Sequence, residues 1–472
     1  MARTFRARDS TALWWTLAGI VASIMVTALV VVAPLVAVLL ISACLYLWTF
    51  LWKVELFFAV HFAIAFIALI TVPILRLTAA ENNLRFVVAA LLVATAIAVA
   101  IRVKVAPPGA LVALSALFFI LGIISTASVT DDNEWLFYGL ELLVAGTAIV
   151  FAAAAVKLNA WPTVAKILIL ATAAEAALAV FEVVQLNAPL WRGGRILTDG
   201  TSTWMRNELI ASIPRAQGTF GHPLPLAFML VLGTLTLIRT QAFRLPTRFA
   251  LFVLMGVGVF VSGSRNAIIL FVALSALTLA LPALVKRVPI LIMLGIGGLA
   301  VAAPFLVNQF EQIITTGSVF HRVGALESVS RLTSSRGTFA VLFGDGSAAT
   351  PRLYSEGLLQ SDGLAAVDNQ YVLTFAQNGL IGLAIMVMMM AIAFRRASTT
   401  LRVLLFAVAI TGMIFDLFTW PAVGFTVWFV IAAAFSRMPE PGMKATSFVP
   451  TTQPRENIGK LITKPLTPTK IS

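Results

Sequence analysis

The chain has 472 residues, of which 60% are hydrophobic and only 11% are charged. A soluble globular domain carries about 25% charged residues, so this composition excludes a soluble multidomain enzyme, a coiled coil and a disordered chain. The formal net charge of +13 would suggest a nucleic-acid partner in a soluble protein, but here it must first be weighed against the positive-inside rule. The single cysteine, Cys44, permits neither an intrachain disulfide nor a cysteine metal cluster.

Apolar stretches of roughly twenty residues recur as far as about residue 436. They predict an all-α, polytopic transmembrane helical bundle of about 12–14 spans, with one large extracytoplasmic loop between late spans. In chain order the predicted spans are 13–32, 35–52, 56–75, 84–101, 110–128, 135–156, 163–185, 223–239, 247–262, 266–285, 288–306, 369–394, 401–416 and 420–436.

The spans divide the chain into six regions. We expect an N-terminal transmembrane bundle, a first long outer loop, central spans, a large outer loop with candidate functional residues, C-terminal spans, and a disordered basic cytoplasmic tail. These regions are 1–185, 186–222, 223–306, 307–368, 369–436 and 437–472, respectively.

The distribution of lysine and arginine predicts the orientation. With both termini in the cytoplasm, the inner segments hold 22 of the 33 cations, including all nine lysines, and the other 11 cations are outer arginines. This asymmetry predicts a multi-pass membrane protein with both termini in the cytoplasm and both long loops outside. An arginine-only outer face favours bidentate recognition of phosphate or carboxylate, although a genome that prefers arginine would give the same bias.

Four acidic residues fall inside predicted spans, where charge is costly and usually functional: Glu141, Glu175, Glu182 and Asp416. Glu175 and Glu182 are seven residues apart, which is two helical turns and therefore one helix face. Such residues could form an ion or proton path, or they could make structural hydrogen bonds within the bundle. Neither a nucleotide-binding P-loop nor an HExxH zinc motif occurs, so we expect no metal site and no cofactor.

Four polar strings lie on the predicted outer face. The first runs from Arg215 to His222 and leads into the span at 223–239, and the second is the short turn 262–266, which contains Arg265. The third contains Arg331, Arg336 and a Gly-Asp-Gly turn at 344–346, a combination suited to binding an anion. The fourth, 368–371, contains Asp368, Asn369 and Tyr371. Asp368 could alternatively be the N-cap of the helix that follows.

These strings resemble the O-antigen ligase and O-antigen polymerase family, which are integral-membrane glycosyltransferases with lipid-linked sugar donors. The similarity rests on the GTFGHP segment at 218–223, on Ser-Arg at 264–265, and on Arg336 before a shortened Leu-Gly-x-Gly turn. It rests most on Asp-Asn-Gln-Tyr-Val-Leu at 368–373, followed by Asn-Gly-Leu-Ile-Gly at 378–382. The matching part runs from about 213 to 383, and the first seven spans match only in general character.

The resemblance implies roles for individual residues. Arg265, together with Arg336 or Arg331, would bind the donor diphosphate, and Arg215 and His222 belong to the same substrate-binding set. The ligases have a catalytic histidine where this chain has Asp368. A carboxylate can also serve as a general base, so Asp368 is the expected catalytic residue, and Asn369 and Tyr371 would orient the sugar or the base.

The resemblance therefore implies a metal-independent, inverting membrane glycosyltransferase that polymerises or transfers a polyprenyl-diphosphate-linked glycan on the outer face of the bacterial inner membrane. Its expected partners are that oligosaccharide, an acceptor glycan or lipid, membrane lipids, and polysaccharide-export or chain-length proteins, with no nucleic acid among them. The alternative is a transporter or flippase for a lipid-linked or anionic substrate, which would use the intramembrane acids for coupling. A third alternative is a non-catalytic scaffold in a polysaccharide-export assembly.

Overall fold

A computed structural model of the protein describes residues 48–71, 79–126, 132–190, 195–196, 202–203, 206–207, 210, 212–280, 317–347, 349–360 and 367–438. Most of the two first predicted spans, the span predicted at 288–306 and most of the predicted basic tail lie outside these residues. All statements on structure below concern the described part of the chain.

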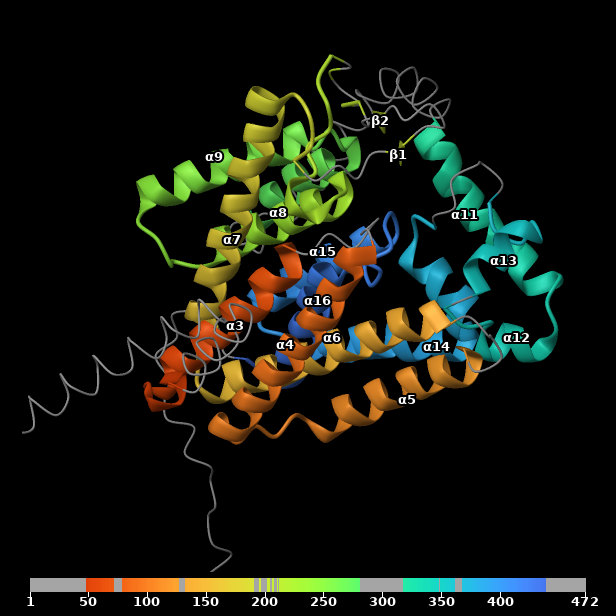
Figure 1. The fold of residues 1–472 in the computed structure, drawn as a ribbon, viewed down its shortest axis with the longest axis horizontal. Helices are drawn as coiled ribbons and strands as arrows, with labels where there is room; N and C mark the ends of the chain where they lie inside the picture. The colour runs from red at the N-terminus through yellow and green to blue at the C-terminus, as the bar shows by residue number, and fades with distance from the viewer. Residues whose placement is uncertain are drawn as a thin grey trace, which may run out of the picture.

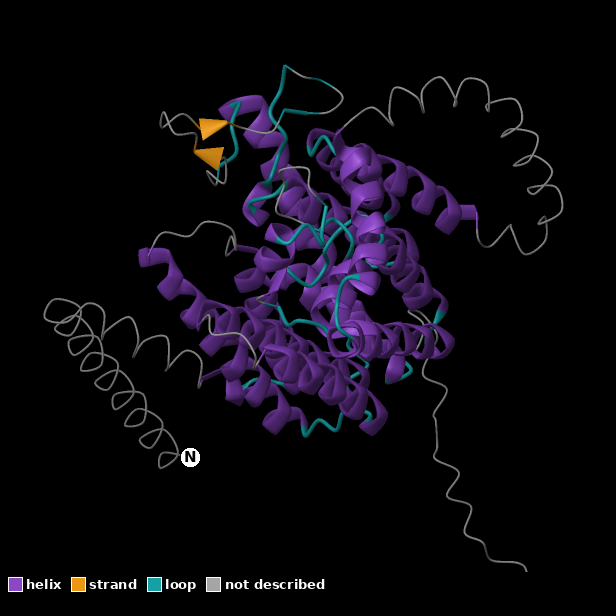
Figure 2. Ribbon diagram, turned by 90° about the vertical axis from the view of Figure 1, so that its right-hand side faces the viewer, coloured by secondary structure: helices purple, strands orange, loops and turns teal. Residues whose placement is uncertain are grey.

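The described chain is helical apart from one small ladder (Figures 1 and 2). The ladder pairs β1 (Arg195–Ile196) with β2 (Ser202–Thr203) antiparallel. The helices are η1 (Thr49–Leu51), α3 (Val54–Thr71), α4 (Ala79–Val103), α5 (Gly109–Thr126), α6 (Asp132–Lys157), α7 (Trp161–Phe181), the π-helical turn η2 (Glu182–Leu186), η3 (Gly218–Phe220), α8 (Pro223–Arg239), α9 (Leu245–Val261), Arg265–Ala280, α11 (Gly317–Ser334), α12 (Thr338–Phe343), α13 (Ala349–Ser355), α14 (Gln370–Arg396), α15 (Thr399–Gly412) and α16 (Pro421–Phe435). The predicted all-α class is confirmed, whereas the number of spans stays a prediction.

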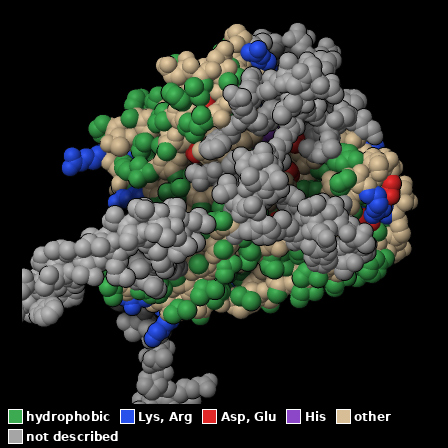
Figure 3. All heavy atoms as spheres, in the orientation of Figure 1, with side chains coloured by type: hydrophobic (Ala, Val, Ile, Leu, Met, Phe, Trp, Pro, Cys, Tyr) green, Lys and Arg blue, Asp and Glu red, His purple; other side chains and the backbone are tan. Residues whose placement is uncertain are grey.

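Three helices are long and apolar enough to cross a membrane, namely Tyr138–Lys157, Trp161–Leu186 and Gln370–Arg396. Shorter apolar helices occupy the other predicted spans of the described chain. Several of them expose large apolar side chains, such as Ile120 on α5 and Phe249 on α9. Figure 3 shows hydrophobic side chains along the face over α5. Such surfaces suit contact with lipid and are consistent with a membrane protein.

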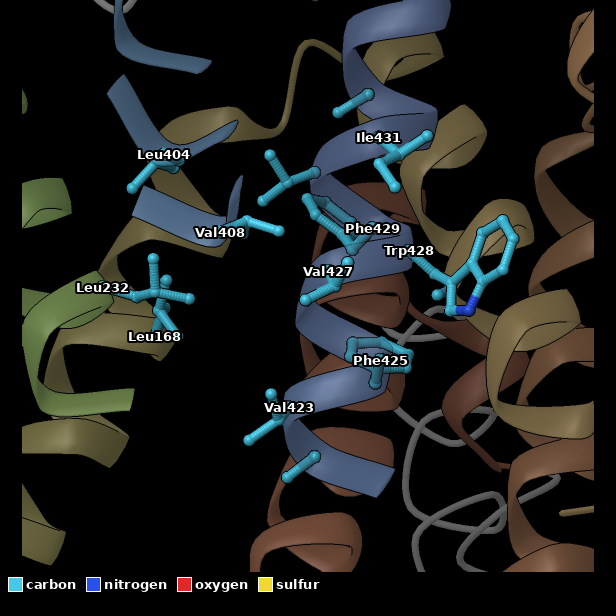
Figure 4. Packing of buried hydrophobic residues seen from close by; sticks show 14 of the residues in the cluster. Leu168, Leu232, Leu404, Val408, Val423, Phe425, Val427, Trp428, Phe429 and Ile431 are labelled. Atoms are coloured by element: carbon cyan, nitrogen blue, oxygen red, sulfur yellow. The ribbon is translucent and has the colours of Figure 1, made fainter. Parts of the chain in front are cut away.

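α16 is the centre of the main core (Figure 4). All its residues are buried, which explains why its sequence is apolar on every side. Phe425 and Phe429 pack against Phe62 of α3, with ring centroids 5.9 and 5.5 Å apart, respectively. Phe118 of α5 packs against Trp428, with centroids 6.2 Å apart. This aromatic core fixes α16 and therefore the segment that precedes it.

The segment predicted as the large outer loop, 307–368, is helical over much of its described part. α11, α12 and α13 lie together at one end of the molecule, beside α14 (Figure 1). A second, smaller core of Leu332, Leu353, Val372 and Phe375 joins this group to α14. The segment is therefore a packed helical unit, and it positions its polar residues against α14.

Candidate functional site

Two buried carboxylates hold the 217–219 turn in place. Glu182 Oε2 accepts hydrogen bonds from the backbone N–H groups of Gln217 and Gly218 at 2.8 and 2.9 Å, and Glu175 Oε2 accepts one from Thr219 at 3.0 Å. Gly218 has φ +54°, and a Cβ there would lie 2.5 Å from Glu175 Oε2. The prediction that Glu175 and Glu182 share one helix face is confirmed. Both have structural hydrogen-bonding roles.

The first two polar strings of the sequence lie side by side. The buried Arg215 donates from Nε to the carbonyl oxygen of Ser262 at 3.0 Å, which ties the loop to the turn after α9. Gly263 in this turn has φ +68°, and a Cβ there would lie 3.0 Å from Arg215 Cγ. Arg265, two residues after Gly263, is half-buried and begins the helix Arg265–Ala280. Arg215 and Arg265 are therefore anchored to the same turn.

His222 joins this loop to the segment before α16. It is the N-cap of α8, where its Nδ1 accepts the Leu224 N–H at 3.3 Å, and its ring stacks on Trp420 with centroids 5.3 Å apart. Burial, with a smaller effect from Arg215, lowers the pKa of His222 to about 3. The imidazole is therefore neutral at physiological pH and is a poor general base.

Asp368 directly precedes the N-cap of α14. The alternative that Asp368 is itself the N-cap is wrong, because Asn369 caps the helix by accepting the N–H groups of Tyr371 and Val372 at 3.0 and 3.1 Å. The Tyr371 hydroxyl donates to the Ala409 carbonyl oxygen at 3.0 Å. Asn369 and Tyr371 thus fix the start of α14 against α15, and Asp368 is half-buried beside the helix N-terminus.

Asp416 is the partner of Asp368 that the sequence did not reveal. The span predicted at 401–416 ends earlier, since α15 stops at Gly412 and Asp416 lies in the connection to α16. Burial, and second the negative charge of Asp368, raise the pKa of Asp416 to about 7. Trp420 donates from Nε1 to Asp416 Oδ1 at 3.3 Å, so one indole contacts both Asp416 and His222. Two carboxylates therefore interact next to the 215–222 loop.

Arg336 belongs to a second cluster around a break in α14. Gly379 interrupts α14 with φ +66°, and the freed carbonyl groups of Ala376 and Gln377 accept hydrogen bonds from the 344–346 turn. Arg336 donates from Nη1 to Ala376 at 3.2 Å and forms an ion pair with Asp345 at 2.5 Å. The Arg336 side chain is only 3% exposed. Asp345 therefore already neutralises this arginine.

Arg331 is half-buried on α11, one helical turn from Ser328, and its Nη2 donates to the Ser328 hydroxyl at 3.0 Å. On the other side of Asp345, Arg352 forms a second ion pair at 2.8 Å. Two arginines of the 331–352 segment, Arg336 and Arg352, therefore pair with one aspartate. The structure brings Arg336 and Arg352 together with Asp345, and it brings Arg215 together with the turn that leads to Arg265.

Two pockets flank the 411–420 segment that contains Asp416. One, of about 330 Å³, is mostly apolar and is lined by Leu224, Phe228, Leu270 and Phe415, with Ser264 and Asn266 as polar members. The other, of about 370 Å³, has a mixed lining, and we call it the polar pocket because amide and hydroxyl side chains belong to it; Gln370 and Phe418 form part of its wall. Both volumes include the open mouth of the pocket and the solvent in front of it.

No group of three or more histidine, cysteine, aspartate or glutamate residues in the described chain is placed to hold a metal ion. Comparison of the sequence with protein-family models and with curated proteins gave no match. A proposal about the function of this protein therefore rests on the geometry of the site.

Proposed function

We propose that the protein is a membrane glycosyltransferase that uses a polyprenyl-diphosphate-linked glycan as donor on the outer face of the membrane. The observation that carries this proposal is the interaction of Asp368 with Asp416 in a segment whose other residues line an apolar and a polar pocket. A reaction between a lipid-linked donor and a sugar acceptor needs one apolar site, one polar site and a proton acceptor between them. The described chain offers all three around the 411–420 segment.

The apolar pocket suits the polyprenyl chain of the donor. Ser264 and Asn266 line it, and Arg265 lies between them in the sequence at the first residue of a helix. A guanidinium and a helix N-terminus both favour a bound diphosphate. Arg215 is held beside the same turn, so the two arginines supply two positive charges to that end of the pocket. In this proposal the arginines neutralise the leaving group, and no divalent cation is required for that purpose.

The carboxylate pair supplies the base. Burial, and second the charge of Asp368, raise the pKa of Asp416 to about 7, so Asp416 retains a proton to near neutral pH and Asp368 is the proton acceptor in this proposal. Asp368 accepts the proton of an acceptor hydroxyl as that oxygen attacks the anomeric carbon. The bond from this carbon to the diphosphate oxygen breaks, the polyprenyl diphosphate leaves with the electron pair, and the new glycosidic bond has inverted configuration. Arg265 stabilises the charge that develops on the leaving group.

The neutral His222 positions this pair and does not exchange protons with it. Its stacking on Trp420 fixes the indole that donates to Asp416, so the loop held by Glu175 and Glu182 orients the carboxylate. Arg336 supports the site from the second cluster, where it holds the break in α14 against the 344–346 turn.

The proposal is tested by replacing Asp368 with asparagine, Arg265 with alanine and Arg336 with alanine, singly, in a strain whose surface polysaccharide depends on this protein. Loss of a general base lowers transfer by about 100-fold or more, so we expect polysaccharide yield to collapse in the Asp368 variant. The exposed Glu356, replaced with glutamine, is the control. If all three variants are folded and keep normal chain length and yield, the assignment is wrong.

A further inference from the structure

The polar pocket near the start of α14 is lined mainly by amide, hydroxyl and aromatic side chains. Amide and hydroxyl side chains of α14, including Gln377, Asn378 and Thr374, line it together with Ser347. Glu141 of α6 is the one charged member among the described lining residues. The rings of Phe118, Tyr138 and Phe418 complete the wall.

The amide groups of this pocket are held by a rigid frame. Gln370 donates from Nε2 to the Thr374 hydroxyl at 3.0 Å and accepts the Phe418 N–H at 2.9 Å. The carbonyl oxygen of Gln377 accepts the Gly346 N–H at 2.9 Å, just before the break in α14 at Gly379. A discontinuous helix within a bundle commonly forms part of a substrate site, because its broken end is fixed by neighbouring segments.

The lining selects the class of ligand. Amides and hydroxyls donate and accept side by side, which matches the dense hydroxyl groups of a sugar ring, and aromatic walls suit its apolar C–H faces. The described lining offers no cation, which disfavours a phosphate, and its polarity disfavours a lipid chain. A single carboxylate accepts hydrogen bonds from adjacent hydroxyls and disfavours a second carboxylate on the ligand.

We propose that this pocket is the acceptor-sugar subsite and that Glu141 restricts it to neutral or amino sugars, excluding uronic acids. The inference rests on the proposed function, since it assigns the sugar class of the same site. Gln370 and Phe418 join the pocket to the start of α14 and to the segment of Asp416. A sugar in the pocket therefore lies beside the two segments that contain Asp368 and Asp416.

Direct binding tests this inference without the transfer reaction. The purified full-length protein in nanodiscs is mixed with glucose, N-acetylglucosamine or glucuronic acid, and saturation transfer to the sugar ring protons is measured by NMR. In wild type, saturation should transfer to the first two sugars, and the transfer to glucuronate should be about tenfold weaker, because Glu141 repels its carboxylate. Glu141→Gln should bring glucuronate to within about threefold of glucose, since the amide removes that repulsion.

Gln377→Leu removes one amide from the pocket lining. Its matched control is Gln241→Leu, in the exposed connection between α8 and α9. We expect saturation of glucose to fall in the first and to equal wild type in the second. Asp368→Asn should bind sugar as wild type does while losing transfer. Wild type that binds sugar but transfers none supports the subsite and counts only against the proposed function. No saturation in folded wild type, or an unchanged preference in Glu141→Gln, overturns the inference.

Discussion

Replacing Asp416 with asparagine should make the folded protein more stable at pH 8 and leave its stability nearly unchanged at pH 4. Burial and the charge of Asp368 raise the pKa of Asp416 from 3.8 to about 7, so the folded state disfavours the ionised carboxyl group. That penalty is absent below the unfolded pKa, grows between about pH 4 and 7, and is complete above the folded pKa. Asparagine carries no charge and retains an oxygen that can accept the Trp420 hydrogen bond.

The size of the effect follows from the pKa. A rise from 3.8 to about 7 corresponds, at about 1.4 kcal/mol per pKa unit, to at most about 4 kcal/mol of free energy of unfolding. Asp416 is partly exposed, so screening by water reduces this to about 2–3 kcal/mol. A gain of that size raises the melting temperature of a large domain by several degrees.

Thermal melting of purified wild type and Asp416→Asn, followed by tryptophan fluorescence from pH 4 to pH 9, measures this difference. The melting temperature of Asp416→Asn should exceed that of wild type by an amount that grows between about pH 4 and 7 and stays constant at higher pH. Asp368→Asn should reduce it, because removing the neighbouring charge lowers the pKa of Asp416. A difference that is the same at every pH, or one with wild type more stable at pH 8, refutes the reasoning.

Three further sets of substitutions test the packing around the site by melting temperature. Glu182→Ala leaves three backbone N–H donors without their acceptor, which costs about 1–3 kcal/mol each, whereas Glu182→Gln should cost less. Gly379→Ala should prevent folding, because the new Cβ would lie 2.3 Å from a backbone oxygen. Gly357 also has a positive φ but has open space around it, so Gly357→Ala should lower the free energy of unfolding by only about 1–2 kcal/mol. Asp345→Asn leaves the buried Arg336 without its counter-ion and should cost about 3–5 kcal/mol, and an additional Arg336→Met should recover part of that loss. Equal melting temperatures in either matched pair, or no recovery in the double variant, would contradict these contacts.

Much of the fold follows from local sequence. Apolar runs of the right length predicted every helix of the described bundle from α3 to α9, and prolines at the first turns of α8 and α16 suit helix starts. The same-face argument for Glu175 and Glu182 also succeeded, because it depends only on helical periodicity. The helical packing of 317–355 was missed, since that segment is too polar to give an apolar-span signal.

The site was harder to predict, because its parts meet only through tertiary packing. Asp416 was read as a span residue, and nothing local indicates that the start of α14 lies beside it. Arg336 and the 344–346 turn were grouped correctly, yet the sequence could not show that Asp345 from that turn would pair with Arg336. Asn369, next to Asp368, is an equally good N-cap residue, and local preferences do not separate the two.

Under the proposed function, this protein forms a glycosidic bond by itself. The most direct measurement supplies purified wild type in proteoliposomes, without any ion gradient, with a radiolabelled polyprenyl-diphosphate oligosaccharide and a sugar acceptor. We predict a longer labelled glycan and released polyprenyl diphosphate with wild type, and neither product with folded Asp368→Asn. Movement of labelled donor across the bilayer with no new glycosidic bond would contradict the account and would identify a transporter.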